Sequence, residues 1–302
     1  MPVFHVGFQK TGTTHLQEKL FPLHRYFVGH NAPSYPVEFK ILADLGRLFQ
    51  GNSPREFNES HLVGILESAG NHRLASEALF SYENLVRSPF LFSDRFVGLL
   101  SSGKYEQELD RWVFASRLKW LRSFFPGPDA PIFLLTVRDQ ASALASLYAQ
   151  QSHQIKSASQ SHFEDSVYAY LEYLQNGDRR SHLNFSFVAN SILNEFQSGG
   201  ARVFFIPNEK LSTPEFLAFF ETISSSQLPV KAKQRYLSAS RTYSRFDGSS
   251  WELRPPRKHK TRRVARISLN EALIADVKAV FAPLNLAISP DYIPLGLGED
   301  YI

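Results

Sequence analysis

The first seventeen residues contain the pattern that most constrains the fold of this chain. A short apolar run, residues 3–8, is typical of a buried strand, and a loop of small residues follows it. Leucines then recur at helical spacing, at positions 16, 20 and 23. A strand, a small-residue loop and a helix start form a pocket for an anion, because the loop amides and the helix N-terminus present positive potential. We therefore predict that this segment binds a phosphate or sulfate group.

The loop offers one cation and several hydroxyl groups to such an anion, in the run Lys10, Thr11, Gly12, Thr13 and Thr14. The usual nucleotide loop reads G-x-x-x-x-G-K-[ST], with its lysine after the second glycine. Here Gly7 and Gly12 have that separation, but Thr13 occupies the lysine position. Because the usual lysine reaches the β and γ phosphates, its displacement to position 10 argues against an NTPase. A plain structural turn with a solvated Lys10 is the alternative.

A second motif follows the strongest predicted strand, residues 131–137. Arg138 ends this strand, and Ser146 lies eight residues later on the next helix. Ligands of open α/β sheets bind at the carboxyl ends of the strands, so Arg138 and the amino-terminal loop are expected at one sheet edge. A guanidinium suits a phosphate, and Ser146 can donate one hydrogen bond. The alternative is a structural pair in which Asp139 caps a helix and Arg138 is solvated.

The run K-T-G-T-T resembles the 5′-phosphosulfate loop of sulfotransferases that use 3′-phosphoadenylyl sulfate (PAPS), in particular their bacterial-type carbohydrate and small-molecule branch. Arg138 with Ser146 resembles the family's 3′-phosphate site, although Gln140 stands where proline is usual. The resemblance covers most of residues 1–220 and is weak beyond Ser240. It implies PAPS as sulfuryl donor, adenosine 3′,5′-bisphosphate (PAP) as product, and a set of cofactor-binding residues: Lys10, Thr11, Gly12, Thr13, Thr14, Arg138 and Ser146.

Two catalytic residues are expected from the same resemblance. Lys10 would stabilise the charge that develops on the leaving phosphate. Glu77, in L-A-S-E-A-L-F, matches the glutamate that several branches place after an early strand, and it would take the proton of the acceptor hydroxyl. A capping or paired glutamate is the alternative reading, and His72 and His61 are the other candidate bases. No metal is expected, because cations and amides already bind the leaving group.

Alternating strand and helix patterns predict an α/β fold with a central parallel sheet covered by helices on both faces, in a three-layer P-loop-like arrangement. Residues 73–80 and 201–207 are read as strands, and helices are expected over three ranges, 163–175, 187–196 and 270–281. Glu209 is expected to stabilise a loop. We predict a single sulfotransferase-like domain over residues 1–302, in which residues 31–71 and 240–265 are insertions that cover substrate or cofactor.

Composition narrows the class of protein. Among 302 residues there is no cysteine, which excludes disulfides, thiolate zinc sites and a cysteine nucleophile. No apolar run approaches the ~18 residues of a membrane span, and the first strand begins too early for a secretory signal, so we expect a cytoplasmic enzyme. The net charge of +4 suits an anionic cofactor and does not argue for nucleic acid. The basic run at 254–263 is either a solvated loop or a segment that binds the cofactor's 3′-phosphate or an acidic acceptor.

The expected reaction is sulfuryl transfer to a hydroxyl-bearing acceptor, a saccharide or small molecule. The sequence leaves the acceptor and the oligomeric state open. Two other classes also remain. A P-loop nucleotide kinase or NTPase would bind ATP with magnesium, and a non-catalytic nucleotide- or polyanion-binding module would bind without turnover.

Overall fold

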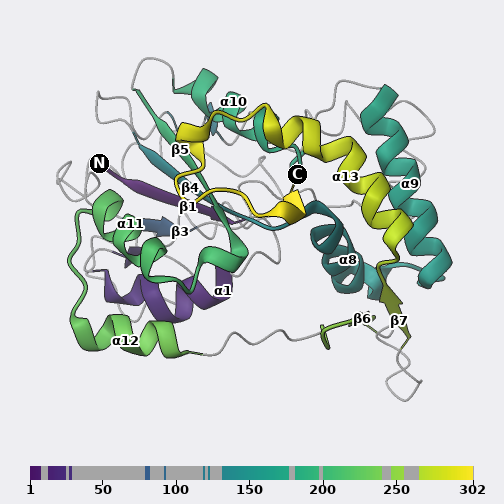
Figure 1. Cartoon of the computed structure of the whole chain (residues 1–302), viewed down its shortest axis with the longest axis horizontal. Helices are drawn as coiled ribbons and strands as arrows, with labels where there is room; N and C mark the ends of the chain where they lie inside the picture. The colour runs from purple at the N-terminus through teal and green to yellow at the C-terminus, as the bar shows by residue number, and fades with distance from the viewer. Residues whose placement is uncertain are drawn as a thin grey trace, which may run out of the picture.

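The computed structural model of this chain describes residues 1–7, 13–24, 27–28, 79–81, 92, 118–119, 122, 131–176, 181–196, 200–239, 246–254 and 265–301. Five strands in this part form one sheet: β1 (Val3–Gly7), β2 (Phe27–Val28), β3 (Leu79–Ser81), β4 (Ile132–Val137) and β5 (Arg202–Pro207). Their order is β2-β3-β1-β4-β5, and every pairing is parallel (Figure 1). The predicted α/β fold with a parallel sheet is therefore confirmed.

The strand register fixes which residues meet at the carboxyl edge of the sheet. β1 pairs with β4 from Val3 opposite Ile132 to Gly7 opposite Thr136. β1 also pairs with β3, and His5 lies opposite Ser81. Since all strands run in the same direction, the carboxyl ends of β1, β3, β4 and β5 lie along one edge.

Two clusters of buried side chains cover the two faces of the sheet. One contains alternate strand residues such as Phe4 and Phe133, together with residues of four helices: α8 (Gln140–Gln151), α9 (Gln160–Asn176), α10 (Phe185–Glu195) and α13 (Glu271–Leu286). The other contains Val3 and Leu134 with residues of η1 (Leu16–Leu20), η2 (Phe21–Leu23), α11 (Pro214–Ser224) and α12 (Val230–Ser238). Strands that are buried on both faces explain why β1 and β4 are almost continuously apolar.

Most predicted elements are confirmed, with shifted ends. The helices expected over 163–175, 187–196 and 270–281 correspond to α9, α10 and α13, and the strand expected over 201–207 corresponds to β5. The strand expected over 73–80 overlaps β3 at Leu79 and Phe80, and β3 also includes Ser81. Residues 73–78 lie outside the described residues.

A small antiparallel hairpin, β6 (Ser250–Glu252) with β7 (Arg266–Ser268), packs against α8 and α9. The Leu253 amide donates to the Ala265 carbonyl over 2.9 Å, and the Arg254 amide donates to Ser152 Oγ over 2.6 Å. The hairpin therefore holds both flanks of residues 255–264, which contain most of the basic run and lie outside the described residues. Residues 31–71, the other predicted insertion, are outside them as well. No helix of the described part is long and apolar enough to cross a membrane.

Candidate functional site

The two predicted binding motifs extend from neighbouring strands. β1 ends at Gly7, and the short helix α1 (Thr13–His15) begins six residues later. Arg138 follows β4 directly, two residues beyond the position that pairs with Gly7. The strand pairing therefore brings Arg138 and the start of the amino-terminal loop to one sheet edge. Lys10, Thr11 and Gly12 lie outside the described residues, Thr13 begins α1, and Thr14 is exposed.

The second motif is built on the start of α8. The side chain of Asp139 accepts a hydrogen bond from the Ser142 amide over 2.8 Å, so Asp139 caps this helix. Arg138 is half-buried. Ser146 lies in the second turn of α8 and is 8% exposed, which leaves its side chain little access to solvent. The capping role considered for Asp139 is thus confirmed, and it fixes the helix that carries both Arg138 at its start and Ser146.

Gln140 has a structural role that proline could not fill. Its Nε2 donates to Asn285 Oδ1 over 3.0 Å, and Asn285 Nδ2 donates back to Gln140 Oε1 over 3.3 Å. Asn285 also donates to the Tyr301 carbonyl over 2.8 Å. Because both amides are buried, they need these partners, and Gln140 and Asn285 thereby link α8 to α13.

Tyr301 packs against the end of β4, next to Gln140 and Asn285. Its buried hydroxyl lies 3.3 Å from the Val137 carbonyl and 3.2 Å from Glu209 Oε2, so its one proton is shared between two acceptors. Burial raises the pKa of Tyr301, so the phenol stays protonated. Partial burial of the Glu209 carboxyl raises its pKa as well, and the charges of Asp139 and Asp300 act in the same direction. Glu209 therefore accepts a hydrogen bond from Tyr301, while its negative charge is disfavoured at this position.

A buried polar chain near the carboxyl edge of the sheet was not anticipated from the sequence. His5, on β1, is 0% exposed, and its Nδ1 lies 2.8 Å from Ser81 Oγ on β3. Its Nε2 lies 3.3 Å from Thr136 Oγ1 on β4. Gln17 of η1 donates to Ser81 Oγ over 2.9 Å. Burial lowers the pKa of His5 to about 3, so the ring is neutral near pH 7. In the sequence, the indication of this group is one polar residue within each of the apolar strands β1, β3 and β4.

A cavity of about 160 Å³ lies at the start of α8. Its polar lining includes Asp139, Ser142, Lys278 and Asp300, and α13 supplies apolar side chains on another side. Sites for drug-sized ligands and cofactors usually measure about 300–1,000 Å³, so this cavity alone is too small for a nucleotide. No group of three or more His, Cys, Asp or Glu side chains suited to a metal ion is found in the part of the chain that the structure describes.

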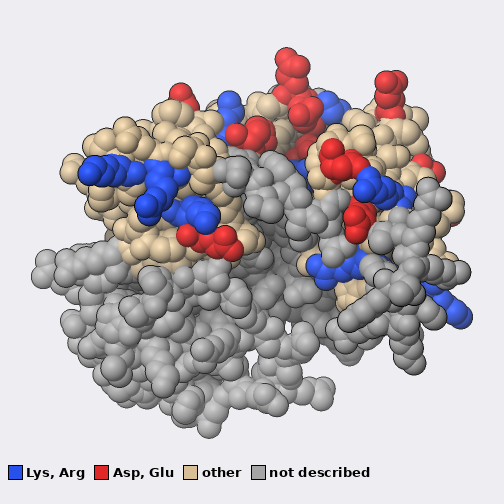
Figure 2. All heavy atoms as spheres, turned by 90° about the horizontal axis from the view of Figure 1, so that it is seen from below, with Lys and Arg blue, Asp and Glu red and all other residues tan. Residues whose placement is uncertain are grey.

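Charges of both signs are interspersed on the face of the molecule that carries α12 (Figure 2). On α12 itself, Lys231 and Arg235 are exposed, whereas Lys233 pairs with Glu221 at 2.6 Å. The hydrogen bond from Lys233 lowers the pKa of Glu221. On the described part of this face, basic and acidic side chains therefore lie side by side and do not form a single basic patch.

The bounds of β3 change the expected position of a general base. Because β3 runs parallel to β1, its carboxyl end is Ser81, whereas Glu77 precedes its first residue by two positions. The first carboxylate after β3 in the sequence is Glu83. Glu77, Glu83 and the alternative bases His61 and His72 all lie outside the described residues.

Comparison with known proteins adds no relative. No model of a known protein family matches this chain, and a search of the curated proteins finds no match.

Proposed function

We propose that this chain is a sulfotransferase that moves a sulfuryl group from PAPS to a hydroxyl of a saccharide or small molecule, on a three-layer P-loop-like fold. The observation that supports this proposal most is the parallel pairing of β1 with β4. It brings the end of β1, from which the chain continues to Lys10, and the end of β4, which Arg138 follows, to one edge of the sheet. The described donors fit an anionic nucleotide, since a half-buried guanidinium and a hydroxyl on α8 suit a phosphate.

In this mechanism, PAPS supplies an activated sulfuryl group on a phosphate leaving group. The acceptor oxygen forms a bond to sulfur while the bond between sulfur and the bridging oxygen breaks. Lys10 and the amides of residues 11–14 stabilise the charge that grows on that oxygen. Arg138 and Ser146 hold the 3′-phosphate, which fixes the donor for in-line attack. The proton of the acceptor passes to a carboxylate, and the products are the sulfated acceptor and PAP.

Glu77 is our proposed base, and Glu83 is the residue to compare with it. The resemblance favours Glu77 by its local pattern, whereas the bounds of β3 favour a carboxylate that follows Ser81. Replacing either glutamate by glutamine keeps the shape of the side chain and removes its ability to take a proton. We expect the base variant to bind PAP normally and to lose transfer, and the other variant to remain active. Two fully active variants would assign the base to His61 or His72.

The direct test compares two ligands by thermal unfolding. We expect PAP, at about 100 times its Kd, to stabilise the protein by about 2.7 kcal/mol, and ATP with magnesium to stabilise it much less. Stabilisation by ATP with magnesium alone would instead favour a kinase or NTPase. Binding of PAP without transfer from PAPS to any acceptor hydroxyl would favour a non-catalytic module. No stabilisation by either nucleotide would contradict the proposal.

A further inference from the structure

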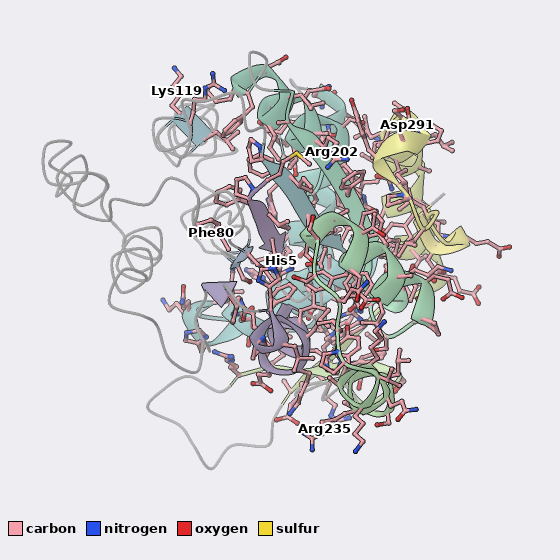
Figure 3. The ribbon with its side chains drawn as sticks, turned by 90° about the vertical axis from the view of Figure 1, so that its left-hand side faces the viewer. His5, Phe80, Lys119, Arg202, Arg235 and Asp291 are labelled. Carbon is pink, nitrogen blue, oxygen red and sulfur yellow. The ribbon has the colours of Figure 1, made fainter. Side chains whose placement is uncertain are left out.

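His5 connects three strands near the carboxyl edge of the sheet, two residues before the end of β1. In Figure 3, His5 lies among the strands beside Phe80 of the neighbouring β3. His5, Ser81 and Thr136 are each within three residues of the carboxyl end of their strand, and none is more than 3% exposed. With Gln17 of η1 they form a continuous hydrogen-bonded group, which we call the His5 chain.

The members of the His5 chain can all be satisfied with a neutral imidazole. Gln17 donates from its Nε2 and so occupies one lone pair of Ser81 Oγ. Ser81 Oγ can then either donate to His5 Nδ1 or accept from it with its second lone pair, and Thr136 Oγ1 takes the complementary role at Nε2. In both tautomers one ring nitrogen donates and the other accepts, which agrees with the lowered pKa of His5.

The position of the His5 chain within the sheet is informative. On the same face, the amino-terminal halves of these strands carry only apolar side chains into the core: Val3, Leu79, Ile132 and Leu134. In the described residues of β1, β3 and β4, the polar side chains on this face, His5, Ser81 and Thr136, lie toward the carboxyl edge. Apolar packing is non-directional, whereas hydrogen bonds define distance and angle. A directional link is therefore placed where the two proposed phosphate-binding motifs begin.

The His5 chain also spans both flanks of residues 8–12. His5 lies two residues before the end of β1, and Gln17 lies four residues after the start of α1. Through Ser81, these two flanks are tied to each other. Through Thr136, they are tied to β4, which leads directly into Arg138.

We propose that His5 is a positioning residue, which holds the ends of β1 and β4 so that the Lys10 loop and Arg138 bind two phosphates of one ligand. The inference rests on the function proposed above. His5 itself is buried and is not expected to touch the ligand. Its effect is to preorganise the two motifs, so its loss should weaken ligand binding in protein that is still folded.

The test uses two variants that break the chain at different points and one matched control. His5→Leu removes both ring nitrogens, and Thr136→Val removes one hydroxyl while keeping the branched shape. Tyr170→Phe is the control, because it removes another fully buried hydroxyl, which pairs with Ser181 on the face of the sheet opposite the His5 chain. Thr136→Ser keeps the hydroxyl and serves as the conservative rescue.

We expect the Kd for PAP, measured by calorimetry well below each unfolding midpoint, to rise about tenfold in His5→Leu and Thr136→Val. The Tyr170→Phe control should lower the unfolding midpoint and leave Kd unchanged, and Thr136→Ser should bind nearly as the unmodified chain does. If His5→Leu does not fold, the Kd of Thr136→Val for PAP tests the proposal by itself. Wild-type affinity in Thr136→Val would overturn the proposal and reduce the His5 chain to a stabilising element.

A second measurement separates failure of this inference from failure of the proposed function. If the unmodified chain does not bind PAP, the proposed function has failed, and amide hydrogen exchange over residues 7–17 still tests the positioning role. We then expect faster exchange in Thr136→Val than in Tyr170→Phe, since only the former loosens the flanks of the loop. Equal exchange in the two variants would overturn the inference without reference to any ligand.

Discussion

The ends of β1 and β4 lie next to each other, but they are supported in different ways. The end of β1 is held by the His5 chain, a buried and neutral group of hydrogen-bonded side chains that links three strands. The end of β4 rests on a group that we call the Tyr301 cluster: Gln140, Asn285, Tyr301 and Glu209. This cluster links β4 to α13 and to the last residues of the chain, and it contains an ionisable carboxylate.

We therefore expect the ends of β1 and β4 to have different roles at the proposed site. A neutral chain within the sheet does not respond to pH near neutrality, because the pKa of His5 is about 3. It is suited to hold a loop that takes part in chemistry. The Tyr301 cluster fixes the first turn of α8 and so the position of Arg138, which we propose to bind ligand. Replacing Lys10, which follows β1, should therefore affect turnover first, and replacing Arg138, which follows β4, should affect affinity first.

Lys10→Ala is expected to have the largest effect. Loss of one donor that stabilises developing charge should reduce kcat by roughly two to three powers of ten. The KM for PAPS should change far less, because Arg138 and Ser146 still hold the 3′-phosphate. Steady-state kinetics with saturating PAPS provide the measurement. Lys19→Ala, at an exposed position on η1, is the matched control and should retain full turnover. If Lys10→Ala kept full turnover, Lys10 would have no role in stabilising the transition state.

Arg138→Ala should show the opposite pattern. Hydrogen bonds between charged groups contribute roughly 1.5–3 kcal/mol, so we expect Kd for PAP to rise about 10- to 100-fold. The kcat at saturating PAPS should stay near that of the unmodified enzyme. The control is Arg202→Ala, an exposed arginine at the amino end of β5 and therefore at the opposite edge of the sheet. Equal Kd values for Arg138→Ala and Arg202→Ala in calorimetric titration would show that Arg138 does not contribute to the binding of PAP.

Gln140→Leu tests the support of Arg138 rather than Arg138 itself. The substitution leaves the buried Asn285 amide without its partner on α8, which should lower the free energy of unfolding by about 1–3 kcal/mol. Urea denaturation measures this change. In a double-mutant cycle with Asn285→Leu, the double variant should lose less than the sum of the single losses, because both polar partners are then removed. Strict additivity would mean that the two amides do not act as a pair.

Local sequence patterns predicted the parts of the fold that depend on local signals. The apolar runs of β4 and β5 and the helical periodicity of α9 and α13 were sufficient to place these elements within a few residues. The strand predicted over 73–80 overlaps β3 only at Leu79 and Phe80 among the described residues, because a three-residue strand carries little pattern and its register is set by pairing with β1. Its position in turn decides whether Glu77 or Glu83 follows the strand.

The His5 chain shows a second limit of sequence reasoning. His5 and Ser81 are 76 residues apart, and His5 and Thr136 are 131 residues apart. A single polar residue in an apolar strand gives no indication of its partners until the strand order and register are known. Gln140 was recognised as a departure from the family pattern, but its partner Asn285 lies 145 residues away. The motifs that extend from the strands were therefore visible in the sequence, whereas the groups that support them were not.

Glu209→Gln should have the smallest effect, and it separates the two supporting groups by their pH dependence. The raised pKa of Glu209 means that this carboxyl binds more protons in the folded than in the unfolded state. The free energy of unfolding should therefore be higher below the ordinary glutamate pKa of about 4.3 and should fall as the pH rises through the raised value. Although its carboxyl is partly buried, Glu209 as a residue is exposed, so screening by solvent keeps this contribution small.

The measurement is the unfolding midpoint from about pH 4 to about pH 8. A glutamine at position 209 still accepts the hydrogen bond from Tyr301 and has no charge to lose, so the variant should have a flatter profile and a slightly higher midpoint near neutral pH. Thr136→Val changes the His5 chain, which contains no carboxylate, and should shift the whole profile downward without altering its slope. A Glu209→Gln profile parallel to that of the unmodified chain would mean that the end of β4 is no more sensitive to pH than the end of β1.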